Sequence, residues 1–149
     1  MSSIVKEVEY YYSLVADKPG EARKLLEFLS EKNVNLQAFT VFPTGDGRSH
    51  LDLFPVEPQA LKDAAEDAKV PIVGPKRAFL IQGEDRVGAL YEFHLKLSNA
   101  GINIHASNGV VEGTGRFGYV VYVNEEDYDK AAEALKASDR RTIQTSPRK

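Results

Sequence analysis

DKPGEARKLLEFLSEKNVNL, residues 17–36, and DRVGALYEFHLKLSNAGINI, residues 85–104, are two versions of one stretch, 68 positions apart. The offset needs no gap and extends beyond the quoted residues. The pairs that match are Asp17 with Asp85, Gly20 with Gly88, Leu29 with Leu97, Asn35 with Asn103, Ala38 with Ala106, Gly45 with Gly113, Gly47 with Gly115 and Arg48 with Arg116. These matches fall at turns and element ends, so we infer that the chain is an internal duplication.

The first copy is expected to form strand, helix, strand, strand, helix, strand. Aromatic and β-branched residues indicate strands, and apolar residues at i, i+3, i+4 and i+7 indicate one face of a helix. A Gly-rich turn between two strands is typical of a hairpin. The expected elements are a strand at 8–16, a helix through 22–29, strands at 35–43 and 49–56 around the turn TGDGR, a helix through 61–68 and a strand at 70–74.

The second copy repeats this order. It has a strand at 77–83, a helix through 90–97, strands at 103–111 and 117–124 around GTGR, and a helix through 128–135. KVPIVGPK, residues 69–76, contains two prolines and a glycine and is expected to be the junction. We therefore predict two domains, residues 1–74 and 75–149.

The order βαββαβ is that of the ferredoxin-like unit, an antiparallel sheet with two helices on one face. The fold class expected is α+β with two such units. A unit of about 70 residues is only marginally stable alone, so we expect the two to bury surface together.

GTGRFG, residues 113–118, has the spelling G-x-G-x-x-G of a dinucleotide-binding turn. That mechanism needs a helix N-terminus after the turn. Here the next residues, YVVYVN, are typical of a strand. The glycines are therefore expected to form a hairpin, and we predict no nucleotide site.

The turn between the first strand and first helix of each copy, DKPGEA and DRVGAL, is the candidate site. It places free backbone N–H groups and the positive end of a helix dipole at one point. Asp17 and Asp85 can accept hydrogen bonds from an ammonium group. Together these groups suit both ends of an α-amino acid. The alternative is that each Asp caps its helix and each Gly allows close packing.

Asn35 and Asn103 lie where the first helix of each copy leads into the next strand. An antiparallel neighbour would bring this strand end close to the other copy's turn. An Asn side chain both donates and accepts hydrogen bonds, which suits a zwitterion. A turn Asn that bonds its own backbone is the alternative.

These residues resemble the ACT domain, a ferredoxin-like sensor of small molecules in amino-acid metabolism. The resemblance covers almost the whole chain as two consecutive units. Asp17-Lys18-Pro19-Gly20 is similar to the family's D-x-P-G turn, and Asp85-Arg86-Val87-Gly88 to a variant without proline. Gly88-Ala89-Leu90 is similar to the G-A-L turn of units that sense aromatic amino acids. The companion motif E-S-R-P is absent, because residues 105–108 read HASN.

The resemblance implies an amino-acid-binding regulatory protein without catalytic activity or cofactor. It implies a ligand held at the strand–helix turns between units, a homodimer, and a regulated protein that the sequence does not identify. Pro19, replaced by Val87, is expected to make the two sites unequal. The ligand-binding residues expected are Asp17, Pro19, Gly20, Asn35, Leu36, Asp85, Arg86, Val87, Gly88, Asn103 and Ile104.

The composition of the 149 residues is that of a soluble globular protein, with 42% hydrophobic and 28% charged residues. No apolar run approaches the ~20 residues of a membrane span. MSSIVKEVEYYY lacks a charged-then-apolar leader, so we expect a cytoplasmic protein. There is no cysteine, which excludes disulfides and thiolate metal sites. The basic tail, residues 140–149, is expected to be a loose terminus or a last strand.

Two other functions remain open from the sequence. A small ferredoxin-fold hydrolase has little support, because His50, His94 and His105 show no metal-ligand spacing and no serine has a base beside it. GRFGYVVY, residues 115–122, looks like the aromatic third strand of an RNA-recognition motif. Tyr119 aligns with the inward-facing Leu51, however, and the net charge is −3, so nucleic-acid binding is the weaker hypothesis.

Overall fold

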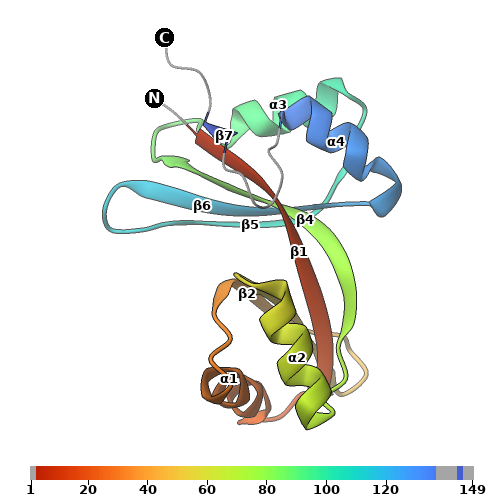
Figure 1. The fold of residues 1–149 in the computed structure, drawn as a ribbon. Coiled ribbons are helices and arrows are strands. Elements are labelled where there is room, and N and C mark those ends of the chain that lie inside the picture. Colours follow the sequence, from red (N-terminus) through yellow and green to blue (C-terminus); the bar gives the residue numbers. More distant parts are fainter. Residues whose placement is uncertain (1–2, 137–143, 146–149) are drawn as a thin grey trace. The chain divides into compact units, whose positions relative to one another are not determined.

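The structure is a computed structural model that describes residues 3–136 and 144–145. Strands and helices follow one another along the chain in the predicted order, except that the strands predicted at 70–74 and 77–83 are one strand, β4 (Figure 1). The elements are β1 (Ser3–Ala16), α1 (Glu21–Glu31), β2 (Leu36–Pro43), β3 (Arg48–Pro55), α2 (Pro58–Ala68), β4 (Val73–Glu84), α3 (Tyr91–Asn99), β5 (Ile104–Val111), β6 (Arg116–Val123), the 3-10 turn Glu125–Asp127, α4 (Tyr128–Leu135) and β7 (Gln144–Thr145).

The duplication is visible in hydrogen bonds that recur 68 positions apart. In both copies the backbone N–H of the first residue after the leading strand donates to the carbonyl of a glycine in the hairpin. In both copies the strand before the hairpin, β2 or β5, also has a register shift at its second residue. The matching backbone bonds are Asp17 to Gly47 and Asp85 to Gly115, both 2.9 Å, and Val34 to Leu29 at 2.8 Å and Ile102 to Leu97 at 2.9 Å. The matching register shifts lie between Leu36 and Ala38 and between Ile104 and Ala106.

The chain divides into two compact units. The first-repeat unit is residues 9–76, and the second-repeat unit comprises the described parts of residues 1–8 and 77–149. The sequence predicted domains of 1–74 and 75–149, so the structure groups the first eight residues differently. The physical reason is that Val5 is buried in the hydrophobic core of the second-repeat unit.

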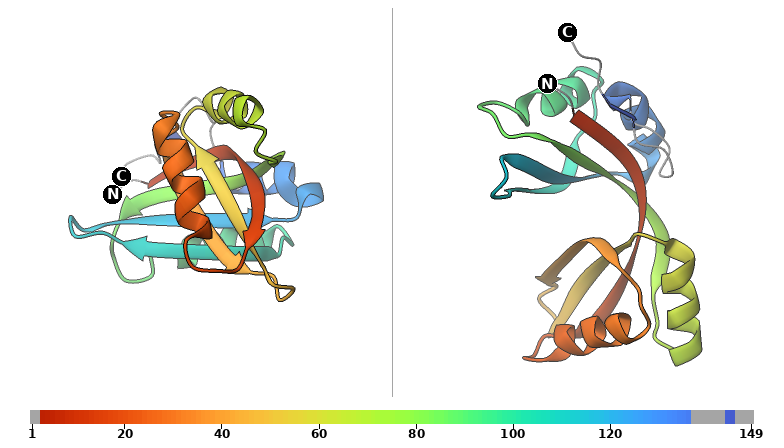
Figure 2. Two further views of the ribbon diagram at one scale, coloured as in Figure 1. Left: turned by 90° about the horizontal axis from the view of Figure 1, so that it is seen from below. Right: turned by 60° about the vertical axis from the view of Figure 1, so that its left-hand side comes forward.

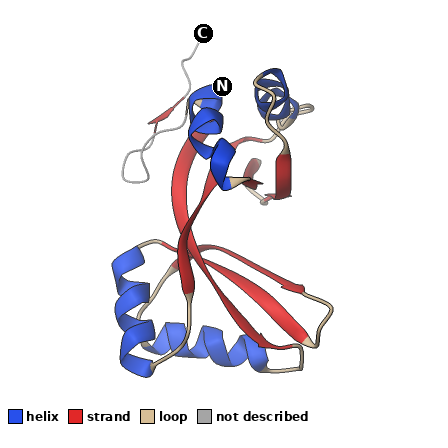
Figure 3. Ribbon diagram, turned by 90° about the vertical axis from the view of Figure 1, so that its right-hand side faces the viewer, coloured by secondary structure: helices blue, strands red, loops and turns tan. Residues whose placement is uncertain are grey.

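In the first-repeat unit the strand order is β2-β3-β1. Helices α1 and α2 lie on one face of these strands (Figure 3). The core lies between helices and sheet, because alternate β3 residues face the apolar stripes of both helices. The buried side chains are Tyr11, Leu25, Leu29, Val34, Leu51, Leu53, Leu61 and Ala64.

In the second-repeat unit the strand order is β5-β6-β4, with residues 3–8 of β1 beyond β4. Helices α3 and α4 are packed side by side (Figure 2). The buried Tyr128 stacks on Phe79, with ring centroids 4.4 Å apart, and its hydroxyl donates to the Ala78 carbonyl at 2.8 Å. Burial raises the pKa of the Tyr128 hydroxyl, which therefore remains a hydrogen-bond donor.

The position of a fourth strand in the second-repeat unit is taken by the N-terminal segment of the chain. Residues 3–8 lie beside β4, and a Cβ built on Gly83 would lie 3.4 Å from the Ser3 Cβ. Of the predicted basic tail, only Gln144 and Thr145 lie within the described residues. They form β7, which pairs with Val5 and Ile4 of β1.

The second half of the predicted junction lies inside a strand. KVPIVGPK was expected to separate the units, and the units do divide after Lys76, but β4 begins at Val73 and continues through Gly74 and Pro75 to Glu84. Proline's fixed φ is compatible with extended backbone, and only its missing N–H limits pairing. The breaker residues therefore do not end the strand.

Among the described residues, no helix has the length and apolar content needed to cross a membrane.

Candidate functional site

The turn between β4 and α3 is the strand–helix turn of the second repeat. Gly88 has φ +80°, a left-handed conformation that favours glycine, and a Cβ built there would meet no atom within 4 Å. Within the described part of the chain, the amides of Gly88 and Leu90 donate to no backbone carbonyl. The turn thus presents open N–H groups at the start of a helix, as the sequence predicted.

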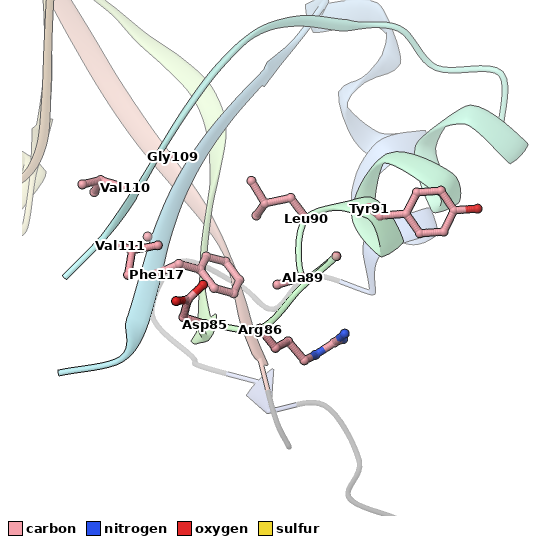
Figure 4. A pocket seen from close by; sticks show the side chains of 11 residues that line it. Asp85, Arg86, Ala89, Leu90, Tyr91, Gly109, Val110, Val111 and Phe117 are labelled. Carbon is pink, nitrogen blue, oxygen red and sulfur yellow. The ribbon is translucent and has the colours of Figure 1, made fainter. Parts of the chain in front are cut away.

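A pocket of about 320 Å³ lies against this turn. Its walls come from the turn, from the start of α3 and from the ends of β5 and β6 that adjoin their hairpin (Figure 4). The lining residues are Asp85, Arg86, Gly88, Ala89, Leu90, Tyr91, Gly109, Val110, Val111, Phe117 and Gly118. The volume is at the lower end of the range of ligand pockets and suits a small metabolite.

The side chains give the pocket an apolar interior and a charged rim. In Figure 4 the Leu90 side chain and the Phe117 ring lie between the turn and the strands, whereas the Tyr91 ring points away from the sheet. The Arg86 guanidinium bonds the Glu92 carboxylate at 2.9 Å. The Asp85 carboxylate makes no hydrogen bond or ion pair with any described residue. Asp85 is therefore the group at this pocket that is available to a cationic partner.

The N-termini of α1 and α3 have no side-chain cap. Gly20 is the N-cap of α1 and Leu90 the N-cap of α3, and neither N-terminus receives a side-chain hydrogen bond. The alternative in which Asp17 and Asp85 cap their helices is wrong.

The first-repeat turn has the same backbone but a different use of its aspartate. Gly20 has φ +90° and an open Cβ position, like Gly88. The Ser49 hydroxyl, which is buried, donates to the Asp17 carboxylate at 3.2 Å. Pro19 is exposed at the surface. This turn therefore already holds one of the protein's own side chains.

A wider hollow of about 640 Å³ lies elsewhere in the first-repeat unit, between the end of α2 and the start of β4. Lys62, Glu66 and Lys69 are at its rim. It contains none of the predicted site residues.

The predicted strand-entry residues do not join either turn within their own unit. Asn35 and Asn103 are exposed, and Leu36 and Ile104 pack at the edges of the two cores. β2 runs antiparallel to β3 from Leu36, opposite Pro55, to Pro43, opposite Ser49 beside the Asp17 turn. The Asn ends of β2 and β5 are therefore remote from the turns. Of the second-repeat residues predicted, Asp85, Arg86 and Gly88 line the pocket, and Val87, Asn103 and Ile104 do not.

The strand residues of the pocket were not predicted. Gly109 and Gly118 stand inside strand patterns, and an isolated glycine in a strand signals a bulge or a close approach to the backbone. That signal was present in the sequence. Val111 was typical of a core residue, and Phe117 stood only in the nucleotide and RNA patterns, which did not predict this pocket.

The nucleotide and RNA patterns do not correspond to sites. Residues 113–118 lead from the end of β5 into β6, so the glycine motif is a hairpin turn. Phe117 and Tyr119 are 7% and 5% exposed and belong to the core, so they cannot stack on bases. The described residues contain no group of three or more metal-ligating side chains.

Comparison with family models gives no match to this chain, and comparison with curated proteins gives none either.

Solved structures share the fold across nearly the whole chain. Protein BT0572 from Bacteroides thetaiotaomicron superimposes with a TM-score of 0.75 at 19% identity, covering 97% of this chain and 93% of that one. The regulatory subunit of aspartate kinase from Thermus thermophilus gives 0.60 at 16% identity, covering 91% and 95%. The putative C-terminal regulatory domain of aspartate kinase from Porphyromonas gingivalis gives 0.52 at 17%, also covering 91% and 95%. At these identities the likeness establishes the architecture alone, which is α+β.

Proposed function

We propose that this chain is a regulatory protein of the ACT type, which binds an α-amino acid at a strand–helix turn and is not itself an enzyme. The observation that carries the proposal is the pocket beside Asp85. It combines a carboxylate that has no partner among the described residues, open amides at the start of α3 and an apolar lining. An ammonium group suits the carboxylate, a carboxylate suits the amides, and a side chain suits the interior.

The mechanism is linkage between ligand and assembly. An amino acid that binds one arrangement of units better than another shifts the equilibrium by its difference in affinity. The protein that receives the signal, the homodimer and the cytoplasmic location are parts of this proposal. Asn35 and Asn103 lie far from the turns of their own units, so they contribute only if a neighbouring unit brings them to a ligand.

The shared fold of regulatory domains supports the proposal only at the level of architecture, because function resides in sites rather than in folds. The pocket itself must therefore be tested.

Thermal unfolding in the presence of each common amino acid tests the function. A ligand at 100 times its Kd stabilises the folded state by about 2.7 kcal/mol, which raises the Tm by about 5–10 °C for a chain of this size. Asp85→Asn should abolish the shift while leaving the Tm without ligand unchanged, because the Asp85 carboxylate has no partner in the described chain.

The matched control is Asp67→Asn, an exposed Asp-to-Asn change at the end of α2. It should retain the full ligand-induced shift. A panel in which no amino acid raises the Tm would rule the function out. A ligand-induced Tm shift that persists in Asp85→Asn would show that the amino acid binds at another place.

A further inference from the structure

The two repeats provide an internal comparison of the pocket, because each lining residue has a counterpart 68 positions earlier. In the second repeat the apolar side chains that line the pocket include Ala89, Leu90, Val111 and Phe117. The counterparts in the first repeat are Glu21, Ala22, Pro43 and Ser49. The second-repeat turn thus faces an apolar surface where the first-repeat turn faces two polar side chains.

Those two polar side chains, Ser49 and Glu21, occupy the groups of the first-repeat turn that a ligand would use. Ser49 bonds the Asp17 carboxylate, so a ligand ammonium would have to displace this contact. Glu21 is at the start of α1, where its negative charge already interacts with the helix dipole, and it also bonds Lys24 at 3.0 Å. A ligand carboxylate at the same point would be repelled by Glu21. The counterpart of Glu21, Ala89, carries no charge.

Gly109 of β5 adds depth to the second-repeat pocket, because it carries no side chain. A Cβ built on Gly109 would lie 3.0 Å from Tyr119 Cδ1 and 3.5 Å from Leu90 Cδ1. Tyr119 cannot easily move away, because it is buried and its hydroxyl lies 2.6 Å from His94 Nε2. At the corresponding position β2 carries Val41. The bare backbone that deepens the pocket therefore exists only in the second repeat.

We infer that the chain has one amino-acid site, in the second-repeat unit, and that this site selects an apolar side chain. The largest side chain that fits is set by the space that Gly109 leaves open. The inference rests on the proposed function and specifies its ligand class and its stoichiometry. A charged or amide side chain is excluded because the interior side chains offer it no hydrogen-bond partner, and an unpaired polar group is costly to bury. Apolar side chains instead gain the hydrophobic contribution of Leu90, Val111 and Phe117.

Titration calorimetry of the full chain with valine, leucine, methionine, phenylalanine, glutamine, aspartate and lysine tests the inference. We expect binding of apolar members at one ligand per chain, with affinity at least about 10-fold above that of glutamine, aspartate and lysine.

Substitution at Gly109 tests the subsite. Gly109→Val, which introduces the residue of the first repeat, should weaken binding of leucine and phenylalanine by about 10-fold or more. Gly109→Ala should weaken them less, and in both variants the loss should grow with the size of the ligand side chain. General destabilisation would instead weaken all ligands equally. Gly113→Ala is the matched control, because its Cβ meets no atom within 4 Å and Gly113 does not line the pocket.

The outcomes separate this inference from the proposed function. Two ligands per chain, a preference for polar amino acids, or equal effects of Gly109→Val and Gly113→Ala would overturn the inference while leaving an amino-acid-binding protein. If no amino acid binds the unmodified chain, the proposed function and the inference both fall.

Discussion

Asp17 and Asp85 occupy the same position in the two repeats, yet their carboxylates have different surroundings. The difference comes from one strand residue, Ser49 in β3 against Phe117 in β6. The Ser49 hydroxyl donates to the Asp17 carboxylate, whereas the Phe117 ring has no hydrogen bond to give to Asp85 and instead forms a pocket wall. This pair of residues thus adds to the two other differences between the turns, Glu21 against Ala89 and Val41 against Gly109.

Asp46 provides a test at the residue scale. Hydrogen bonds from the Arg48 guanidinium, and then from the Thr44 hydroxyl, lower the pKa of the Asp46 carboxyl from 3.8 to about 2. Since the pKa is depressed in the folded state, the contribution of this group to stability is present above pH 3.8 and is lost as the pH falls through 2.

The measurement is an NMR titration of the Asp46 side chain. We expect a midpoint near pH 2 in the unmodified chain and a higher midpoint, closer to 3.8, in Arg48→Ala. Equal midpoints in the two proteins would show that the bond to Arg48 does not form in solution. The β5–β6 hairpin of the second repeat has Thr114 at the position of Asp46, so it has no carboxyl group to titrate there.

At the scale of elements, β4 carries core residues of the second-repeat unit and ends at the turn that lines the pocket. Gly83 is buried in this strand, and a Cβ built on it would lie 2.9 Å from Phe117 Cε2 and 3.4 Å from Ser3 Cβ. Because Gly83 has no side chain, the Phe117 ring of β6 can lie at the pocket. For the same reason, residues 3–8 can approach β4.

Gly83→Ala should lower the free energy of unfolding by about 1–3 kcal/mol, because overpacking forces the Phe117 ring or the N-terminal segment to move. Displacement of the ring should also weaken amino-acid binding. Urea unfolding measures the first effect and calorimetry the second. Gly113→Ala serves again as the control, and a Gly83→Ala protein as stable as that control would contradict the close packing of Gly83 against Phe117.

At the scale of the whole molecule, β5 stands at the end of its unit's strand order and pairs only with β6 among the described strands. β5 is exposed along most of its length, and Val110 and Val111 are 70% and 53% exposed. Open strand edges with apolar residues favour pairing with another chain. We propose that β5 pairs with a second copy.

Sedimentation of the unmodified chain should therefore give twice the mass of one chain at micromolar concentration. Val110→Lys should shift the equilibrium toward single chains, because a charge on the edge opposes pairing. Thr114→Lys, in the adjoining hairpin, should remain a dimer. Single chains at all concentrations in the unmodified protein would refute the proposal.

The order of elements and the duplication could be read from residues close in sequence. Stripes such as Leu25 and Leu29, and turns such as Gly45 to Arg48, depend on local periodicity and on local backbone preference. The N-terminal segment could not be read in this way. Lys6 and Glu7 interrupt its apolar pattern, and its strand forms beside β4, more than 70 residues away.

The sequence by itself determined two βαββαβ copies, the strand–helix turns with Gly20 and Gly88, and the nature of GTGRFG as a hairpin, because periodicity and backbone preference act over a few residues. The sequence already predicted unequal turns from Pro19 and Val87, but only the tertiary structure decided how they differ and that the pocket lies beside Asp85. That pocket requires Leu90, Gly109 and Phe117 from three separate elements to meet. Their meeting depends on strand register and on packing against Tyr119, which no local pattern encodes.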